Sequence, residues 1–504
     1  MDRNLTPAKN LRTLFAGLGA FVLPDIEIAD LTLDSRKVQA GGAFVALPGL
    51  RSHGLEFAAE AVSRGASVIL WEPRDGVSVP ALPHSVHAVP IPGLSGLIGT
   101  IADRFFDAPS QSIAVAAVTG TNGKTTTAYV LAAALAYLGK SSAYAGTLGY
   151  GPIGAVKSGT HTTPDSITLQ RELAELRAAG TTHLAIEVSS HALDQQRVAG
   201  VRLDTAVFTN LTRDHLDYHG TLEAYGAAKA KLFAWPGLKH AVINVDDAFG
   251  RELAASHRNG ALIICSRSSS TSRASLPSNA GYLHARGVVA GSHGLDIDIE
   301  SNRGSATLRS RFVGDFNVDN VLAVLGVLLG WGFSLEQSVE AVEHCAAPPG
   351  RMETFAAPGQ PLAIVDYAHT PDALEKALLA ARQHSSGKLV CVFGCGGDRD
   401  AGKRPLMGAI AERVADIVIV TDDNPRTEDG DVIVADIVKG CVAPEQLIVE
   451  RDRAAAIERA IRLSTAADVV LIAGKGHEDH QIVGLEQRYF SDRDVVTAAL
   501  GRNS

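Results

Sequence analysis

The segment TGTNGKTTT at residues 119–127 has the composition of a loop that binds phosphate. It follows the apolar run SIAVAAVTG at 112–120, which predicts a buried strand, and precedes an alanine-rich helix expected over 128–137. Glycines let backbone N–H groups approach phosphate oxygens, and a helix N-terminus carries partial positive charge. Lys124 would reach the β- and γ-phosphates, and the Thr125 hydroxyl would bind Mg²⁺. The order of strand, loop and helix therefore predicts a nucleoside triphosphate site.

This loop is a shortened variant of the general phosphate-loop pattern. Val118 stands where that pattern has its first glycine, so Gly120 is the first glycine here. A chance glycine-rich turn is the alternative, but the required order of strand, loop and helix favours the phosphate loop. The loop residues expected to bind ATP are Gly120, Thr121, Asn122, Gly123, Lys124, Thr125 and Thr126.

Two polar segments and a lysine pair follow the phosphate loop. Glu187 of EVSSH comes just past an apolar run, and His215 lies in FTNLTRDHLDYHG at 208–220. Both side chains are suited to Mg²⁺ beside a triphosphate. Lys229 follows in YGAAKAKLF. Taken alone, Glu187 is most simply a solvated carboxylate and His215 an exposed histidine. Their order after a phosphate loop favours a shared metal and nucleotide site.

The length of 504 residues exceeds what one hydrophobic core supports, roughly 250–300 residues, so we expect several domains. Apolar runs at 112–120, 183–190, 204–210 and 240–246 alternate with helical stretches, which is typical of a doubly wound parallel sheet. A second such set marks a Rossmann-like domain; its runs are 362–369, 388–397, 416–426 and 468–479. We predict an α/β protein of three domains: a smaller mixed α/β unit at 1–108, a central ATPase-like domain at 109–345 and the C-terminal domain at 346–504. The run SRSSSTSRAS at 266–275 is expected to be a polar surface loop.

Composition excludes several classes of partner. The formal charge is −9, which gives no overall attraction to nucleic acid or to an anionic membrane. No run of about 18 uncharged apolar residues occurs, and the N-terminus lacks the pattern of a signal peptide. The five scattered cysteines suit a reducing cytoplasm, where we expect a monomer. Cys391 and Cys395 form a C-x-x-x-C, for which two reduced side chains are favoured over a metal or redox site.

At this point the chain resembles the Mur ligase family, which also includes the folylpolyglutamate synthetases. The motifs that carry the resemblance run in order through nearly the whole sequence: TGTNGKTTT, EVSSH, TNLTRDHLDYHG, AAK, GDFNVDN (314–320), PGRME (349–353), DYAHTPD (366–372) and GKGHE (474–478). The resemblance implies a nucleotide-sugar domain, a central ATPase domain and a Rossmann-like C-terminal domain. It also implies an ATP-dependent ligase that forms an amide bond through an acyl phosphate.

The resemblance assigns roles at the matching positions. Glu187 and His215 would bind Mg²⁺, so His215 would be a metal ligand and not a general base. Lys229 would be carbamylated by CO₂, and the carbamate would hold a second Mg²⁺. The expected catalytic residues are therefore Lys124, Lys229 and His215. Further nucleotide contacts are implied for Asn317 with adenine, and for Arg351 and Asp366 with the phosphates and the ribose.

The resemblance also indicates the substrates. LTLDSRKVQAGGAFVALPGLRSHG (31–54) resembles the domain that binds a UDP-muramoyl nucleotide, with Leu33 and Ser35 at the uridine end. The residues that would hold UDP-N-acetylmuramoyl-L-alanyl-D-glutamate are Thr162, Thr163, Ser189, Gln195 and Arg197. His161 stands where some members have asparagine, and no role is assigned to it.

DDNPRTED (422–429) resembles the motif of the family members that add meso-diaminopimelate, in peptidoglycan precursor synthesis. An arginine fork pairs with a carboxylate through two parallel hydrogen bonds, and diaminopimelate has a distal carboxylate that lysine lacks. The residues assigned to this amino acid are Arg399, Asp423, Asn424, Pro425, Arg426, Gly474 and Glu478. A type I turn with a solvated Arg426 is the alternative for this motif. For the whole chain, the alternatives are a ligase that adds lysine or glutamate, and a nucleotide switch or motor.

Overall fold

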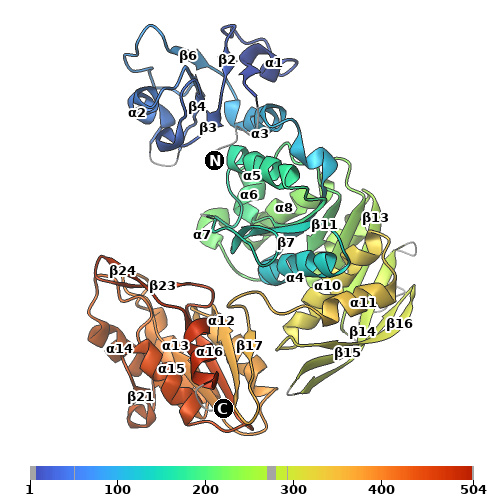
Figure 1. Cartoon of the computed structure of the whole chain (residues 1–504), viewed down its shortest axis with the longest axis vertical. Helices are drawn as coiled ribbons and strands as arrows, with labels where there is room; N and C mark the ends of the chain where they lie inside the picture. Colours follow the sequence, from blue (N-terminus) through green and yellow to red (C-terminus); the bar gives the residue numbers. More distant parts are fainter. Residues whose placement is uncertain (1–6, 50–51, 160, 269–279, 292, 502–504) are drawn as a thin grey trace. The chain divides into compact units, whose positions relative to one another are not determined.

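The computed structural model describes residues 7–49, 52–159, 161–268, 280–291 and 293–501 (Figure 1). The chain divides into two compact units. The first comprises residues 1–124, 139–242 and 255–262, and the second comprises 125–138, 243–254 and 263–504. Most of the polar loop expected at 266–275 lies outside the described residues. Among the residues that the structure describes, no helix has the length and apolar composition needed to span a bilayer.

The N-terminal part of the first unit is a small parallel sheet with strand order β3-β4-β5-β6. Its helices bury Leu11, Leu14, Ile98 and Ile101 in one core with Leu70 of the sheet. The elements, with a short β1-β2 pair, are β1 (Lys9–Asn10), α1 (Leu11–Phe15), β2 (Glu27–Ile28), β3 (Leu31–Thr32), β4 (Ala43–Ala46), α2 (Ala58–Ser63), β5 (Val68–Trp71), β6 (His87–Pro90) and α3 (Leu94–Phe105). This is the mixed α/β unit that the sequence predicts.

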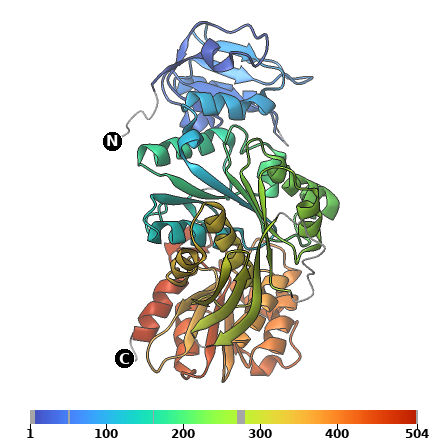
Figure 2. The same ribbon diagram turned by 90° about the vertical axis from the view of Figure 1, so that its right-hand side faces the viewer.

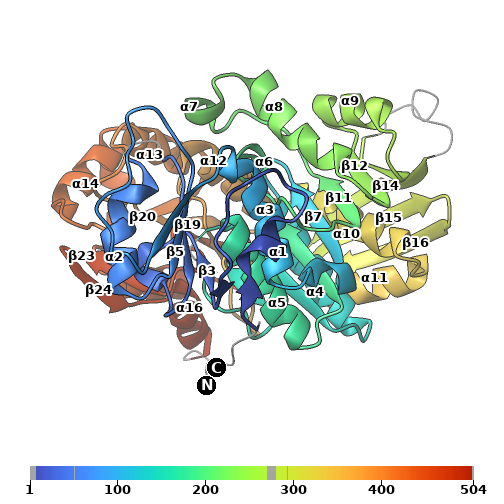
Figure 3. The ribbon, with the colours of Figure 1, turned by 90° about the horizontal axis from the view of Figure 1, so that it is seen from above.

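The rest of the first unit contains the strands that carry the predicted phosphate site. Their order is β11-β7-β10-β8-β9, and all neighbours are parallel except β8 with β9. The elements are β7 (Ala114–Thr119), β8 (Ser142–Gly146), β9 (Gly149–Gly151), α5 (Ser166–Ala178), β10 (His183–Glu187), α6 (Ser190–Asp194), β11 (Thr205–Phe208), α7 (Leu216–His219) and α8 (Leu222–Ala230). Figure 3 shows α7 leading into α8. Because parallel strands end at the same edge, the loops after β7, β10 and β11 meet there.

The sequence interpretation missed the antiparallel strands that follow in the second unit. β14 (Gly281–Gly291), β15 (Gly294–Ser301) and β16 (Gly304–Ser310) pair antiparallel, as Figure 2 shows. In β15, Leu295, Ile297 and Ile299 are buried while Asp298 is exposed. This alternation is typical of a sheet with one face in water and not of a parallel sheet covered on both faces. The expected parallel sheet is therefore extended by antiparallel strands.

Two strands at the division between the units and several helices complete this region. The strands are β12 (His240–Asn244), as expected, and β13 (Ala261–Ser266), which pairs parallel with β14. The helices are α4 (Lys124–Tyr137), α9 (Ala248–Ser256), α10 (Phe316–Gly330) and α11 (Leu335–Glu343). The helix expected at 128–137 is thus present as α4 and begins four residues earlier, at the lysine of the phosphate loop.

The C-terminal sheet has strand order β17-β18-β22-β19-β20-β21, and only β17 is antiparallel. Its elements are β17 (Glu353–Phe355), β18 (Leu362–Asp366), α12 (Pro371–Arg382), β19 (Leu389–Phe393), α13 (Lys403–Val414), β20 (Ile417–Val420), α14 (Gly430–Val438), β21 (Ile448–Val449), α15 (Arg453–Arg462), β22 (Val469–Ala473), β23 (His480–Val483), β24 (Glu486–Tyr489) and α16 (Asp492–Gly501). Residues of α12, α13 and α14 form one core with the sheet, and residues of α15 and α16 form another. All four predicted strands of this Rossmann-like sheet are confirmed.

All five cysteines are free, and Cys391 and Cys395 are buried. Cys391 is on β19, and the Cys395 sulfur lies 3.7 Å from the Met407 sulfur. Burial raises the pKa of both thiols to about 12, which suits packing and not redox chemistry.

Candidate functional site

The phosphate loop, residues 119–124, depends on glycine at its first turn. Gly120 has φ +152°, and a Cβ added there would lie 1.9 Å from the Thr209 hydroxyl oxygen. Gly123 also has a positive φ, +84°. No other residue type would fit at Gly120 without moving the neighbouring strand end, so the shortened loop has a structural reason for its glycine.

The segment after β11 braces this loop through hydrogen bonds. The amide of Thr121 donates to the Asn210 carbonyl (2.8 Å), and the amide of Asn122 donates to Oδ1 of Asn210 (3.0 Å). The Thr209 hydroxyl donates to the Asn122 carbonyl (2.6 Å), and the Thr212 amide donates to the Thr121 hydroxyl (3.0 Å). The sequence interpretation noted Asn210 but gave it no role. The polar TNLT run after β11 was the available signal, because β11 pairs with β7.

Two lysines converge on this loop. Nζ of Lys124 donates to the carbonyls of Gly120 (2.9 Å) and Thr121 (2.8 Å), and Nζ of Lys229 donates to the same Gly120 carbonyl (2.8 Å). Lys229 is only 1% exposed, and its Nζ lies 4.3 Å from the centroid of the Tyr225 ring. Burial first, and the charge of Lys124 second, lower the pKa of Lys229 to about 6. Near neutral pH this amine is therefore uncharged, which is the form that reacts with CO₂.

Glu187 is completely buried at the end of β10. Its Oε1 accepts hydrogen bonds from the Tyr144 hydroxyl and from the Thr147 amide (2.9 Å), and its Oε2 accepts one from the Thr147 hydroxyl (3.2 Å). A Cβ added at Gly146 would lie 2.2 Å from Oε1. Tyr144 and Thr147 thus orient the carboxylate, a role that sequence reasoning missed because neither residue stands in a motif it used.

The residues assigned to the muramoyl dipeptide lie together beside Glu187. The Thr162 hydroxyl is 3.0 Å from that of Thr147, and the Thr163 hydroxyl donates to the Glu187 carbonyl (2.8 Å). The Ser189 amide donates to the Thr163 hydroxyl (3.2 Å), and Arg197 donates to the Thr163 carbonyl (2.9 Å).

Gln195 completes this set, because its Oε1 accepts from Nη2 of Arg197 at 2.7 Å. His161 lines a small pocket with Thr162 and Glu172. The five candidate residues therefore form one connected hydrogen-bonded surface.

His215 differs from the buried groups around it. It is exposed, has φ +52°, and its ring lies 4.8 Å from that of His191 and 6.0 Å from that of Tyr225. Within the described ranges, no three His, Cys, Asp or Glu side chains cluster as a metal site. A metal at this edge would therefore also need donors of other types, such as a hydroxyl or a modified lysine.

A second concavity of the first unit lies in the N-terminal sheet. Leu33 and Ser35, the two uridine candidates, line a hollow of about 580 Å³ together with Arg36, Phe44 and Pro48. The Ser35 hydroxyl donates to Oε2 of Glu60 (2.6 Å). Both predicted residues therefore face one cavity of a size that can hold part of a nucleotide.

In the second unit, the three further nucleotide candidates have different environments. Asn317 is buried on α10, where it donates to the Val313 carbonyl (2.8 Å) and accepts from Asn320 (2.8 Å). Asp366 accepts hydrogen bonds from the amides of Met352 (2.8 Å) and Ala368 (3.0 Å), and burial raises its pKa.

Arg351 has its guanidinium carbon 4.7 Å from the Tyr367 ring centroid. Its Nε is buried without a hydrogen-bond partner in the part of the chain that the structure describes. Such a donor is costly unless a ligand accepts from it.

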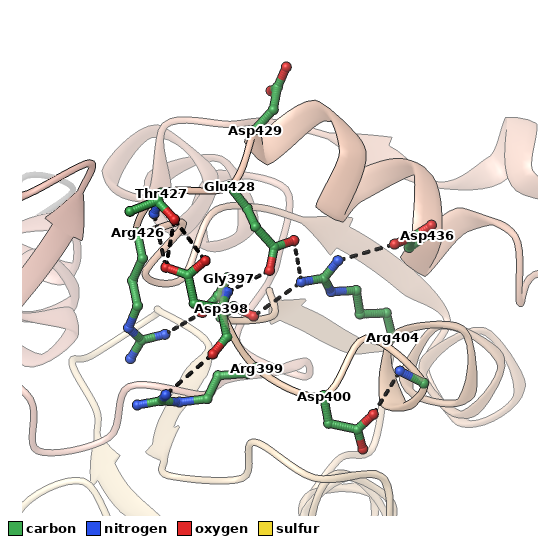
Figure 4. A network of polar contacts seen from close by, with 12 residues as sticks. Gly397, Asp398, Arg399, Asp400, Arg404, Arg426, Thr427, Glu428, Asp429 and Asp436 are labelled. Carbon is green, nitrogen blue, oxygen red and sulfur yellow. Dashed lines mark hydrogen bonds and ion pairs between the residues drawn. The ribbon is translucent and has the colours of Figure 1, made fainter.

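Three loops at the carboxyl ends of β19, β20 and β22 carry the diaminopimelate candidates. We call them the β19 loop (394–402), the β20 loop (421–429) and the β22 loop (474–479). Arg426 of the β20 loop is half-buried, and its Nη1 donates to the Gly397 carbonyl of the β19 loop at 2.8 Å (Figure 4). Within the described residues, Nε and Nη2 of Arg426 have no hydrogen-bond partner. One edge of the guanidinium, Nε with Nη2, is therefore available for a carboxylate.

The β20 and β22 loops are joined by buried polar groups. Asn424 is 2% exposed, and it donates to Oε2 of Glu478 (3.0 Å) and accepts from Nζ of the fully buried Lys475 (3.1 Å). Lys475 also donates to Oε2 of Glu478 (3.0 Å). The Lys475 ammonium and the Asn424 amide offset the effect of burial and lower the pKa of Glu478. Glu478 is thus a fixed carboxylate that can receive an ammonium group.

The remaining candidates border this surface. A Cβ at Gly474 would lie 2.7 Å from Oδ2 of Asp423, so glycine leaves space beside that carboxylate. Pro425 is buried, whereas Arg399 is exposed and donates to the Asp398 carbonyl at 3.3 Å (Figure 4). All seven predicted residues are therefore on these three loops, with Arg426 held more firmly than Arg399.

A phosphate loop beside a buried lysine, and a separate Rossmann-like sheet whose loops present the available edge of an arginine, are typical of a nucleotide-dependent enzyme that handles an amino acid. Family models match three stretches: the Mur ligase family catalytic domain at 27–105, the Mur ligase middle domain at 118–328 and the Mur ligase glutamate ligase domain at 350–476. The chain belongs to the Mur ligase family.

Named relatives align over nearly the full length. UDP-N-acetylmuramoyl-L-alanyl-D-glutamate--2,6-diaminopimelate ligase of Ectopseudomonas mendocina (strain ymp) is 50% identical over 94% of this chain and 95% of its own. The protein of the same name from Pseudomonas aeruginosa is 47% identical over 94% of this chain and 96% of its own. A solved structure of a ligase of that name has a TM-score of 0.72 and 33% identity, covering 98% of this chain and 99% of that one.

Proposed function

We propose that the protein is an ATP-dependent ligase that joins meso-2,6-diaminopimelate to the D-glutamate of UDP-N-acetylmuramoyl-L-alanyl-D-glutamate, a step of peptidoglycan precursor synthesis. The observation that carries the choice of amino acid is the available Nε–Nη2 edge of Arg426. The aligned relatives have this activity in their names. The proposed domains are 1–108 for the UDP-muramoyl group, 109–345 for ATP and 346–504 for the amino acid.

The first step is attack of the D-glutamate γ-carboxylate on the γ-phosphate of ATP, which gives an acyl phosphate and ADP. The loop residues Gly120 to Thr126 would hold the phosphates, and the Lys124 ammonium would neutralise charge on the transferred group. Thr162, Thr163, Ser189, Gln195 and Arg197 would hold the dipeptide, and Leu33 and Ser35 the uridine. Asn317, Arg351 and Asp366 would complete the nucleotide site. Positioning of the two reactants supplies most of the catalysis in this proposal.

The donor set at the strand edge is compatible with Mg²⁺. Thr125, Glu187 and His215 would hold one Mg²⁺ and the carbamate of Lys229 a second, and these ions would offset negative charge on the phosphates. The fit rests on Lys229, because burial lowers the pKa of its amine to about 6 and a neutral amine would be able to react with CO₂. Carbamylation would turn this neutral amine into an anion beside the Gly120 carbonyl, and oxygen donors are what Mg²⁺ prefers.

The second step is attack of the diaminopimelate amine on the acyl carbon, with release of phosphate. Arg426 would pair with the distal carboxylate through its Nε–Nη2 edge, and Arg399 would add charge at the loop margin. Gly474 and Glu478 would receive the distal ammonium and carboxylate, with Asp423, Asn424 and the turn at Pro425 beside them. Lysine lacks the distal carboxylate and would leave the Arg426 donors unpaired, which costs about 1–3 kcal/mol.

An amine-substrate screen tests the proposal. Purified protein, ATP, Mg²⁺ and the UDP-muramoyl dipeptide are incubated with diaminopimelate, lysine or glutamate, and ADP and the ligated nucleotide are measured. We expect product with diaminopimelate and little with the other two. Equal use of lysine would contradict the substrate assignment, and ATP turnover without either acceptor would instead favour a nucleotide switch or motor.

We also propose a cellular compartment and an oligomeric state for the protein. The free, buried cysteines and the nucleotide-linked substrates support a cytoplasmic enzyme. The negative charge of −9 supports the absence of a nucleic-acid partner. We propose a monomer, which gel filtration with light scattering would test.

A further inference from the structure

We propose that Arg404 is a positioning residue that holds Arg426 in register with the distal carboxylate of the amino acid, so that Arg404 sets the amino-acid specificity without touching substrate. This inference rests on the proposed function, because it explains how the arginine fork of that function is kept in place. Arg404 is on α13, 22 residues before Arg426 in the sequence, and it belongs to none of the segments assigned to substrate.

Arg404 is one of the largest fully buried side chains of the protein, at 2% exposure. Its Nη2 donates to Oε2 of Glu428 (2.8 Å), and its Nη1 donates to Oδ2 of Asp436 (3.1 Å). Its Nε is buried without a hydrogen-bond partner among the described residues. Burial of a guanidinium requires the loss of its hydration, so an apolar side chain of similar size would stabilise the fold as well or better. A role in holding loop geometry accounts for it.

The Glu428 carboxylate connects Arg404 to the β19 loop. Its Oε1 accepts the Asp398 amide, while its Oε2 accepts Arg404. The Asp398 carboxylate in turn accepts the Thr427 amide (3.1 Å) and hydroxyl (2.8 Å). Figure 4 shows Asp398 between Thr427 and Glu428, so the β19 and β20 loops are fastened to each other directly after Arg426.

The two loops also pack without spare room. A Cβ at Gly396 would lie 2.9 Å from Nη1 of Arg426, and a Cβ at Gly397 would lie 1.9 Å from the Pro425 carbonyl oxygen. The Gly397 amide donates to the Asn424 carbonyl (2.9 Å). Because the guanidinium lies against this glycine pair, any displacement of the β19 loop moves the Arg426 fork.

The backbone of Arg426 is itself in the left-handed region, with φ +54°. The β23–β24 hairpin holds it there, since the Arg426 amide donates to the Ile482 carbonyl (3.0 Å) and the Gly484 amide donates to the Arg426 carbonyl (2.7 Å). The hairpin therefore fixes the backbone of Arg426, whereas the Arg404–Glu428–Asp398 chain fixes the loop that its side chain rests on. Loss of the second constraint leaves the arginine present but its fork misplaced.

Arg404→Lys and Glu428→Gln test this assignment in the full-length protein. A lysine has a single ammonium group, which cannot reproduce the two-armed contact with Glu428 and Asp436. A glutamine replaces one carboxylate oxygen by an NH₂ donor, so either Arg404 or the Asp398 amide would face a donor in place of an acceptor. The matched control is Arg413→Lys, the same change on the same helix, at an exposed ion pair with Glu375.

For both test variants we expect the KM for diaminopimelate to rise about tenfold, with kcat and the KM values for ATP and the UDP-dipeptide within about twofold of wild type. We also expect the ratio of kcat/KM for diaminopimelate to kcat/KM for lysine to fall by about the same factor, because a misplaced guanidinium no longer pairs with the distal carboxylate. Thermal unfolding is recorded alongside, and the control should leave all kinetic constants unchanged.

An unchanged diaminopimelate KM and an unchanged diaminopimelate-to-lysine ratio in a folded test variant would overturn the assignment. Equal rises in all three KM values would overturn it too, because that result indicates a general structural role. If Arg404→Lys does not fold, Glu428→Gln decides, since the Glu428 side chain is 30% exposed and glutamine has nearly the same size. Failure of the wild type to ligate diaminopimelate at all would instead contradict the proposed function, so the two failures are distinguishable.

Discussion

The phosphate loop and the β20 loop both follow buried parallel strands, yet they are held in different ways. The phosphate loop is braced by hydroxyl, amide and backbone groups of Thr121, Asn122, Thr209 and Asn210. The β20 loop rests instead on charged side chains that are buried beneath it: Arg404, Arg453 and Lys475. Arg453 donates to the Ala473 carbonyl (3.0 Å) and pairs with the buried Asp492 (2.7 Å).

The ligands that the two loops are proposed to bind explain the difference. A triphosphate is recognised by many N–H groups and by net positive charge, for which a short loop and one lysine are enough. An amino acid with two ammonium and two carboxylate groups must be told from lysine by one fixed pair of donors. That task needs a side chain whose direction is set from several sides, and bidentate arginine contacts provide such directional specificity.

The comparison predicts the largest loss for a change in the phosphate loop. Lys124→Ala removes the only side-chain cation proposed for the transferred phosphate, so ligation should fall by about 10³-fold or more. The fold should persist, because Nζ of Lys124 meets two carbonyls and no core. Product formation and circular dichroism measure the two effects. The control is Lys231→Ala, at an exposed ion pair with Asp194. Near-normal ligation by Lys124→Ala would contradict the phosphate-loop assignment.

Lys229→Ala tests the second lysine that contacts the phosphate loop. We expect a loss of about 10²- to 10³-fold, with partial recovery on adding short carboxylates such as acetate or formate, which can take the place of the carbamate. The same Lys231→Ala variant, two residues away, should be neither impaired nor stimulated. Wild-type activity in Lys229→Ala, or rescue by amines and not by carboxylates, would be incompatible with a carbamate.

Arg426→Ala tests the other side of the comparison. Loss of a charge-assisted pair in a mostly closed site should raise the diaminopimelate KM by roughly thirty- to several-hundred-fold, equal to about 2–4 kcal/mol. The KM values for ATP and the UDP-dipeptide should change little, and Arg426→Lys should recover little because an ammonium lacks the planar fork. Steady-state kinetics with each substrate varied checks this, with Arg488→Ala, an exposed pair on the hairpin, as control. An unchanged diaminopimelate KM would refute the role.

The smallest expected effect is on stability. Because burial lowers the pKa of Lys229 from 10.5 to about 6, the unfolded chain binds a proton there that the folded chain lacks at intermediate pH. This difference favours unfolding, increasingly so as pH falls from about 10 to about 6, and is constant below that range. In CO₂-free buffer, Lys229→Met should therefore have a higher Tm than wild type, by a margin that grows from about pH 9 to about pH 6.5. A margin independent of pH would show that the amine is charged in the folded protein.

The sequence by itself determined much of this protein. Val, Ile and Ala runs predicted the parallel strands β7, β10, β11, β18, β19, β20 and β22, because a strand buried on both faces must be apolar throughout. The glycines of the phosphate loop and the arginine of the β20 loop were recognisable from residue type and local order. The antiparallel β14–β16 strands were missed, although the alternation in GLDIDIES indicated them.

Only the tertiary structure decided which groups hold the functional side chains. Asn210 braces a loop about 90 residues earlier in the chain, and Tyr144 orients Glu187 across two neighbouring strands. The sequence gives no sign that Arg404 is buried, because a lysine- and arginine-rich helix start normally faces water. Arg404 is buried because the fold brings the carboxylates of Glu428 and Asp436 to its guanidinium. Such long-range pairing depends on the order of the strands and on the course of the loops between them. For the same reason, the pKa of Lys229 was not predictable from its motif, because desolvation is a property of the folded surroundings.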